Sequence, residues 1–324
     1  MVREAAPGIF CIPIPLPRNP LKELNSYLIT GPRNLLIDTG FRREKCRAAM
    51  TAALDELGVD MTRTDIFLTH LHTDHTGLAP ELASPSSRIY ISEYDRTRMP
   101  GAYDRTSWTR SDDTFRRNGM PAAVLEAQAL KNPMHSQAPR PYDDYLAVQD
   151  GDTFAYGSYA LRAIATPGHT PGHLCLWDEA HQILFSGDHV LFDITPNVTK
   201  WADVPDSLGD YLQSLAAIRD LPARLVLPGH RTVSCSLPQR VDALIAHHEA
   251  RCREVLGILS AAPATAWETA SKMHWDIRAD RWEDFPAAQQ WFAMGEALAH
   301  LDHLHHLGRI RPQEASGRIT WTLC

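Results

Sequence analysis

The residues best suited to chemistry are concentrated in the stretch 69–77, where three imidazoles and a carboxylate occur within six residues. In order they are His70, His72, Asp74 and His75. Histidine and aspartate are ligands for a borderline cation such as zinc. Residues two apart on an extended segment point the same way, so His70 and His72 can bind one metal while Asp74 and His75 face a second. A polar loop with accidental histidines is the alternative, and this spacing disfavours it.

This stretch, H-x-H-x-D-H, resembles the signature of the metallo-β-lactamase superfamily. The resemblance implies further ligands at later strand ends, and the chain offers one for each in the implied order: His169, Asp188 and His230. It assigns His70, His72 and His169 to one metal, Asp74, His75 and His230 to the other, and Asp188, with its two oxygens, to a place between them. The resemblance covers about residues 8–240.

The resemblance also implies supporting roles for residues near the ligands. Asp38, in a D-T-G that ends an apolar run, is expected to help hold the ligand loops. A plain turn aspartate at a strand end is the alternative. His173 is expected to be a buried packing or ligand-supporting residue and not a ligand. Asp74 is expected to pass a proton to the leaving group in addition to binding metal.

The elements that must position these residues alternate between strands and helices. Apolar residues recur at helical spacing over 42–58, where Gly58 ends the helix, and a second helix is expected over 206–221. Strands are expected at 8–12, 26–30, 35–37, 65–69, 161–165, 182–185 and 224–227. Several of these strands end at a ligand, where open sheets place their sites. The fold class implied by the resemblance is α/β, an αββα metallo-β-lactamase sandwich over residues 1–240.

Residues 95–147 are predicted to be an insertion in this domain, because they carry little strand pattern. From 95 to 140 there are eight Lys/Arg and five Asp/Glu, a local charge of +3 in a chain of net charge −7. A solvated helical excursion is one interpretation. The other is a lid that binds an anionic substrate, since arginine favours carboxylate and phosphate. Its candidate substrate-binding residues are Arg105, Trp108 and Arg110, joined by Asn197 from a later loop.

Residues 241–324 are predicted to form a separate domain of three helices and a short hairpin. This pattern resembles a winged helix, which a lactamase-like branch that includes an RNA endonuclease carries as a tail. The third helix has no Lys or Arg between 294 and 308, whereas duplex binding needs cations against phosphates. We therefore expect a packing or homodimerisation module and no DNA binding. His300, His303, His305 and His306 lack a carboxylate partner at matched positions, so no metal is expected there.

Composition excludes several other classes. The 324 residues include six cysteines without a C-x-x-C pair, which favours free thiols in a reducing compartment. The first residues lack the apolar segment of a signal peptide, and no run of about 18 apolar residues predicts a membrane span. A cytoplasmic location is expected.

The predicted function is that of a binuclear metal-dependent hydrolase. Two divalent ions, zinc first and manganese or iron as alternatives, would share a hydroxide that attacks an ester, thioester or lactone carbonyl. Asp188 stands where a true β-lactamase would have cysteine, which favours the binuclear branch of glyoxalase II, lactonases and RNases. The expected partner is a small anionic substrate. Hydrolysis of RNA or another phosphodiester, a non-catalytic regulator and a mononuclear iron dioxygenase remain alternatives.

Overall fold

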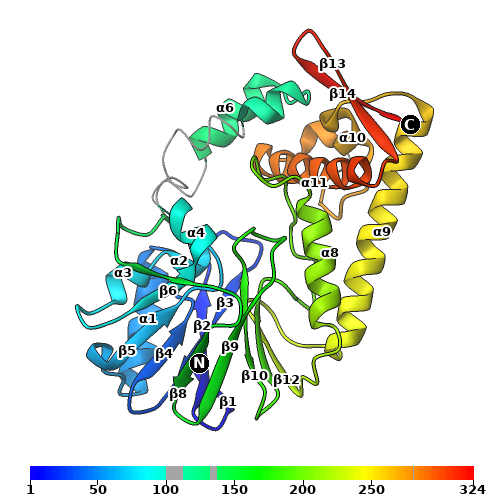
Figure 1. Cartoon of the computed structure of the whole chain (residues 1–324). Helices are drawn as coiled ribbons and strands as arrows, with labels where there is room; N and C mark the ends of the chain where they lie inside the picture. Colours follow the sequence, from blue (N-terminus) through cyan, green and yellow to red (C-terminus); the bar gives the residue numbers. More distant parts are fainter. Residues whose placement is uncertain (100–111, 132–136, 280) are drawn as a thin grey trace. The chain divides into compact units, whose positions relative to one another are not determined.

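The structure is a computed structural model that describes residues 1–99, 112–131, 137–279 and 281–324. The chain divides into two compact units, which can be followed along the colours of Figure 1. The first unit contains residues 1–103, 133–196 and 214–240, and the second contains residues 104–132, 197–213 and 241–324. Each unit therefore combines segments that are far apart in the sequence.

The first unit contains a seven-stranded sheet whose strands lie side by side in chain order. They are β1 (Arg3–Ala6), β2 (Ile9–Pro15), β3 (Glu23–Ile29), β4 (Asn34–Ile37), β5 (Thr64–Phe67), β6 (Ile89–Ser92) and β7 (Tyr145–Val148). Neighbours are antiparallel from β1 to β4 and parallel from β4 to β7. All residues of β5 and β6 are buried, as expected for parallel strands that are covered on both faces.

A five-stranded sheet forms the other half of this unit. In spatial order it consists of β12 (Leu225–Pro228), β11 (Ile183–Gly187), β10 (Leu174–Asp178), β9 (Tyr159–Ala165) and β8 (Thr153–Tyr156). Only the pair of β11 and β12 is parallel. One apolar core joins the two sheets, with edge-to-face ring pairs at Tyr27–Phe185 and Phe67–Phe154, whose centroids are 5.5 Å and 5.7 Å apart.

The predicted helix over 42–58 is confirmed as α1 (Glu44–Glu56), which packs against β2. Its buried face contains Cys46, Met50 and Leu54 at helical spacing. Gly58 follows the helix with φ +63°, a left-handed conformation that glycine adopts at low cost. The repeat of apolar residues therefore predicted both the helix and the face it buries.

Short segments at the ends of the strands carry the chemistry. The strand expected to run to residue 69 ends at Phe67, and the ligand motif continues as a bend into α2 (Thr73–Thr76). The other short helices of this unit are η1 (Met61–Arg63), α3 (Ala79–Leu82) and α4 (Glu93–Arg98). Asp188 directly follows β11, and His230 follows β12. The carboxyl ends of these parallel strands therefore present the candidate ligands.

The described ends of the predicted insertion belong to the first unit. Residues 95–98 lie in α4, and Tyr145 begins β7, which pairs in parallel with β6. Between them, α6 (Ala122–Lys131) belongs to the second unit. The insertion predicted to carry little strand pattern therefore ends in a strand, β7, which buries only its first and last residues and so shows no clear period.

The second unit contains the C-terminal helices and a hairpin. Its elements include α9 (Leu237–Ala261), which begins in the first unit, then α10 (Ala266–Lys272), η2 (Trp282–Asp284), α11 (Ala287–His306), β13 (Ile310–Ala315) and β14 (Arg318–Leu323). The helix α8 (Ser207–Ile218) is likewise divided between the units. An apolar core joins Phe115, Met120 and Leu125 from the earlier segment to Met294 and Trp321. Three helices and a hairpin thus occur in the predicted order, and the comparison with a winged helix stays a prediction.

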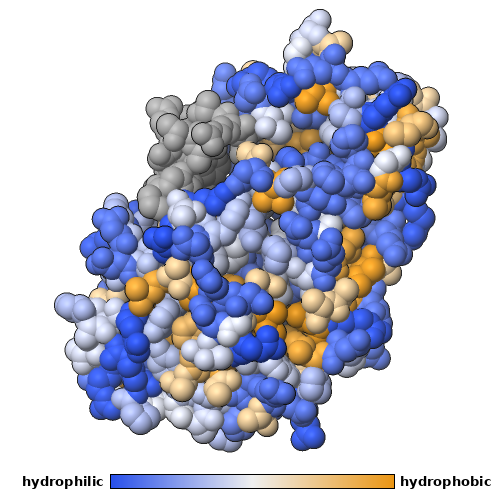
Figure 2. Space-filling view, viewed as in Figure 1, coloured by the Kyte–Doolittle hydropathy of each residue, from blue (hydrophilic) through white to orange (hydrophobic). Residues whose placement is uncertain are grey.

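The drawn face of the molecule is mainly hydrophilic, with apolar residues in scattered patches (Figure 2). No helix among the described residues is long and apolar enough to cross a membrane. All six cysteines are free thiols, as the sequence predicted.

Candidate metal centre

The first group of candidate ligands consists of His70, His72 and His169. Nδ1 of His72 lies 3.0 Å from Nε2 of His70 and 3.0 Å from Nε2 of His169. Two nitrogens bound to one tetrahedral zinc are separated by about 3.3 Å, given zinc–nitrogen bonds of about 2.0–2.1 Å. The three ring nitrogens therefore converge on one point with the spacing that a metal ion requires.

The second group consists of Asp74, His75 and His230. Oδ2 of Asp74 lies 3.4 Å from Nε2 of His230 and 3.9 Å from Nε2 of His75. All three side chains are buried, and their ligand atoms lie within 4.8 Å of one another. Among the described residues, groups of three or more metal-ligating side chains occur only in this cluster.

Asp188 lies between the two groups. Its Oδ2 is 3.6 Å from Nε2 of His75, 3.5 Å from Nε2 of His230 and 3.7 Å from Nε2 of His169. One carboxylate oxygen thus faces imidazoles from both groups. The structure brings together all seven ligands that the sequence predicted, from separate strand ends and loops.

Asp38 holds the first ligand loop from behind. Its Oδ2 accepts hydrogen bonds from Nδ1 of His75 at 2.7 Å and from the Thr69 hydroxyl at 2.8 Å, and its Oδ1 accepts from the Thr69 amide at 2.9 Å. With one proton held on Nδ1, His75 directs Nε2 at the cluster, where it can bind a metal once the proton of Nε2 has left. Asp38 adopts φ +58°, a conformation uncommon outside glycine that occurs mainly where the surroundings impose it.

The His230 loop is held by β3. Nδ1 of His230 donates to the Glu23 carbonyl at 2.7 Å, which leaves Nε2 facing the carboxylates. The Asn25 side-chain amide donates to the carbonyls of Pro228 and Arg231 on either side of His230, at 3.0 Å and 2.8 Å. A buried strand of the first sheet therefore sets the orientation of a ligand that is about two hundred residues away in the chain.

His173 supports the backbone of Asp188 and does not face the cluster with a free nitrogen. Its Nε2 accepts the Asp188 amide at 3.1 Å, so its proton lies on Nδ1, which is 2.8 Å from the Thr166 hydroxyl. Burial, followed by the nearby imidazoles, holds the pKa of His173 well below its usual value, in keeping with this acceptor role. The space behind Asp188 is tight, because a Cβ at Gly187 would lie 2.6 Å from Nε2 of His173.

Electrostatics divide the cluster into two halves. Burial, reinforced by neighbouring imidazoles, lowers the pKa of His72 to about 3 and holds that of His70 well below its usual value. These rings are neutral at pH 7 and can offer lone pairs at once.

The other half is charged in the metal-free chain. Burial opposes charge on His230, but Asp188 and Asp74 outweigh it and raise its pKa to about 10. Burial raises the pKa of Asp74, but His75 and His230 lower it to about 2. The imidazoles and carboxylates of this half therefore form ion pairs, and protons must leave them when a metal binds.

The residues present fit metal ions. Nε2 of His75, Nε2 of His230 and Oδ1 of Asp188 are buried and have no hydrogen-bond partner. Buried polar atoms normally have partners, so atoms without one that point into a shared space are candidates for ligands of an ion. Imidazole and carboxylate donors suit zinc, manganese or iron.

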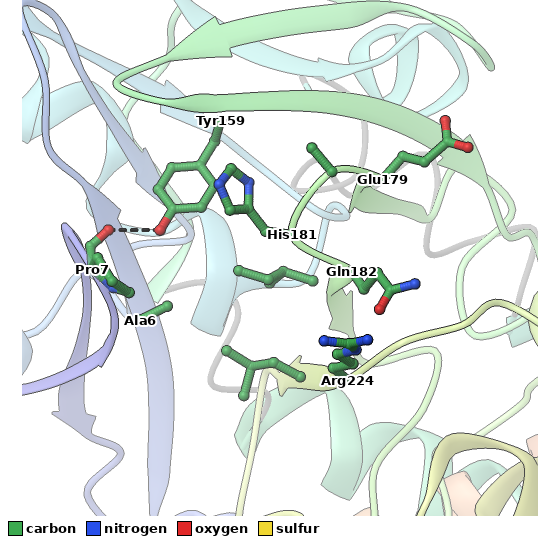
Figure 3. A pocket seen from close by; sticks show the side chains of 10 residues that line it. Ala6, Pro7, Tyr159, Glu179, His181, Gln182 and Arg224 are labelled. Carbon is green, nitrogen blue, oxygen red and sulfur yellow. Dashed lines mark hydrogen bonds between the residues drawn. The ribbon is translucent and has the colours of Figure 1, made fainter.

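Only one of the predicted substrate-binding residues lies in the described part of the chain. Arg105, Trp108 and Arg110 lie outside the described residues, and Asn197 belongs to the second unit. A pocket of about 540 Å³, shown in Figure 3, lies away from the candidate ligands. It is lined by Ile183 and Leu225, the first residues of β11 and β12, whereas the ligands follow the ends of those strands.

Several supporting residues carried no signal in the sequence. Thr69 links Asp38 to Nδ1 of His70, which lies 3.0 Å from its hydroxyl, and Asn25 holds the His230 loop. Thr69 directly precedes the motif, so its position was the one available hint. Asn25 lies within the buried strand β3, beside the equally polar Ser26, so nothing local distinguishes it.

Two family models match the chain. The model described as the metallo-beta-lactamase superfamily matches residues 22–230, and a metallo-beta-lactamase-like C-terminal domain matches residues 252–322. Among solved structures, a metallo-beta-lactamase family protein from Thermus thermophilus is similar at 29% identity and a TM-score of 0.81, covering 99% of this chain and 100% of that one. The predicted fold class is thereby confirmed.

Two of the curated relatives are proteins of Aspergillus. The lactamase-like protein adaB of Aspergillus niger is 26% identical over 87% of this chain and 84% of its own length. The atrochrysone carboxyl ACP thioesterase of Aspergillus fumigatus is 29% identical over 73% of this chain, a region that spans 59% of the relative.

Proposed function

The chain belongs to the metallo-beta-lactamase superfamily and is a metal-dependent hydrolase, and we propose that it uses two metal ions to cleave an acyl thioester or a related ester. The observation that supports two ions is the place of Asp188. One of its oxygens lies 3.5–3.7 Å from imidazoles of both ligand groups. A carboxylate in that position can serve two cations at once. The similarity to a thioesterase supports the acyl substrate.

The residues of the cluster have separate roles in such a reaction. Bound ions supply Lewis-acid chemistry, which polarises a carbonyl and makes water nucleophilic at neutral pH. Asp38 and the Glu23 carbonyl fix the ring orientations of His75 and His230. Asp74 is a carboxylate at neutral pH, since its histidine neighbours outweigh burial and hold its pKa at about 2. It can therefore accept the proton of the attacking water and pass it to the leaving sulfur or oxygen.

A substrate panel with matched variants tests this proposal. Zinc- and manganese-loaded protein is assayed on acyl-CoA and acyl-N-acetylcysteamine thioesters, lactones and phosphodiesters, with elemental analysis in parallel. Asp188→Asn should lower kcat/KM by roughly 100-fold or more and reduce the metal content below two per chain. Asp193→Asn, an exposed aspartate five residues later, is the control and should change neither. Full activity in Asp188→Asn would refute the shared carboxylate, and hydrolysis of phosphodiesters alone would refute the acyl substrate.

A further inference from the structure

Asp95 is a buried carboxylate next to the first ligand group, and nothing described above uses it. It lies in α4, after the end of β6, and is 0% exposed. Its Oδ2 accepts a hydrogen bond from the Leu71 amide at 2.9 Å. Leu71 stands between His70 and His72, so this bond holds the backbone from which both ligands project.

The same carboxylate lies against the loop that carries His169. A Cβ at Gly172 would lie 2.3 Å from Oδ1 of Asp95 and 2.3 Å from the Ser92 hydroxyl. The Ser92 hydroxyl in turn accepts the Asp95 amide at 3.1 Å and fixes the start of α4. The absence of a side chain at Gly172 thus lets the backbone of the His169 loop approach Asp95 closely.

A buried carboxyl group at this position needs a compensating role. Burial raises the pKa of Asp95 to about 7, against the opposing effects of the Leu71 amide, the Arg98 charge, the Thr170 hydroxyl and the Gly172 amide. Burying such a group costs stability unless its hydrogen bonds compensate. The Leu71 bond and the close approach of Gly172 place this carboxylate between two segments about a hundred residues apart, each of which carries candidate ligands of the same group.

We propose that Asp95 is a positioning residue that fixes the His70–His72 segment and the His169 loop relative to each other, and thereby sets the metal affinity of that group. The proposal rests on the two-metal function above. In the other group, the rings of His75 and His230 are oriented by Asp38 and the Glu23 carbonyl, so their orientation does not depend directly on Asp95. The effect of Asp95 should therefore fall mainly on one of two neighbouring sites.

The test is chelator competition on the metal-loaded full chain, with metal per chain measured by elemental analysis. Asp95→Ala should weaken binding at the His70–His72–His169 group by about 10- to 100-fold, the range typical of residues that orient metal ligands. At a chelator concentration that leaves wild type with two metals, the variant should keep one. Gly172→Ala should displace the carboxylate and have the same effect. The double variant should be no worse than either single variant, because both remove one contact.

Asp178→Asn is the matched control for loss of a buried carboxylate. Asp178 accepts the amides of Ala160 and His181, each at 2.7 Å, and these bonds involve no ligand loop. This variant should lower the melting temperature and keep both metals. Asp95→Asn retains one oxygen acceptor, so its metal affinity at the first group should fall between those of wild type and Asp95→Ala. If Asp95→Ala does not fold, the same chelator competition on Asp95→Asn tests the proposal.

Two results would overturn the assignment: Asp95 variants that hold both metals as tightly as wild type, or variants that lose both metals together. A wild-type chain that never binds two metals would refute the two-metal function instead, so the two failures are distinguishable.

Discussion

At the scale of single residues, the neighbours of each aspartate decide what it does. Asp188 faces imidazoles of both ligand groups, whereas Asp38 turns away from the cluster and orients His75 from behind. Asp95 faces backbone amides. The same type of side chain is thus a candidate ligand, an orienting group or a support for a loop, according to whether it faces imidazole Nε2 atoms, a ring Nδ1–H or a backbone amide. Two predictions concern histidines that contact these aspartates.

The first prediction concerns the support of Asp188. His173→Leu removes the acceptor of the buried Asp188 amide, and an unsatisfied buried donor costs about 1–3 kcal/mol. Urea unfolding of the metal-free protein should show a loss of that size. His181→Ala is the control, because the His181 ring is exposed and Asp178 keeps its bonds from the amides of Ala160 and residue 181, so the loss should be only about 0–1 kcal/mol. Equal effects of the two substitutions would contradict the role of His173.

The second prediction concerns pH. In the metal-free chain, burial disfavours charged His230, but the two carboxylates raise its pKa to about 10, against an ordinary value of about 6.5. A raised folded-state pKa contributes stability that is complete below pH 6.5 and is lost as the pH rises to about 10. Chelator-treated protein should therefore melt at a lower temperature at pH 10 than at pH 6.5. His230→Asn should show a smaller decrease over this interval, and parallel decreases would rule out His230 as the cause.

At the scale of elements, close approaches between segments limit what a helix can carry. Gly295 lies inside α11, where its carbonyl accepts the Lys200 amide at 3.1 Å. A Cβ there would lie 2.2 Å from the Thr199 hydroxyl. Glycine is a poor helix residue, so its presence is explained by the loop that packs against it and not by the helix itself.

The third prediction follows from this contact. Gly295→Ala should gain up to about 1 kcal/mol of helix propensity but lose about 1–3 kcal/mol to overpacking, so the melting temperature should fall. Gly257→Ala is the matched control in α9, because a Cβ at that position meets nothing within 4 Å. It should raise stability by roughly 0.5–1 kcal/mol. Thermal unfolding of both variants measures the difference in stability. A higher melting temperature for Gly295→Ala would show that the loop around Thr199 moves aside at little cost.

At the scale of the whole molecule, neither unit is a continuous piece of chain. The core of the second unit combines Phe115, Met120 and Leu125 with residues of α9, α10 and α11. Cutting the chain after residue 240 therefore does not separate the units cleanly. It removes most of one core and leaves the apolar residues of the earlier segment without cover.

The fourth prediction is that a chain ending at residue 240 aggregates or changes its oligomeric state and binds a hydrophobic dye. The exposed Phe115, Met120 and Leu125 provide the reason, since contiguous apolar surface promotes association. Size-exclusion chromatography and dye fluorescence are the measurements. Co-expression of residues 241–324 should restore a soluble complex. A monomeric truncated chain without dye binding would show that the earlier segment folds without the C-terminal helices.

The sequence by itself determined the family, the strands that precede several candidate ligands and the set of residues that gather in the cluster. This was possible because metal chemistry admits few residue types, so His70, His72, Asp74 and His75 are conspicuous at close spacing. The helix α1 could also be predicted, because the apolar residues of a helix face that packs on a sheet recur every three to four positions.

Only the tertiary structure decided which residues support the ligands. The sequence placed Asp95 at the start of a predicted cationic insertion, but Asp95 lies in the first unit and accepts a hydrogen bond from the Leu71 amide. Asn25 lies in the buried strand β3 and donates to the carbonyls on either side of His230. A hydrogen bond to a backbone group requires proximity and direction but no particular residue at the other end. It therefore leaves no pattern in the sequence, and the contact exists only once the strands have brought distant segments together.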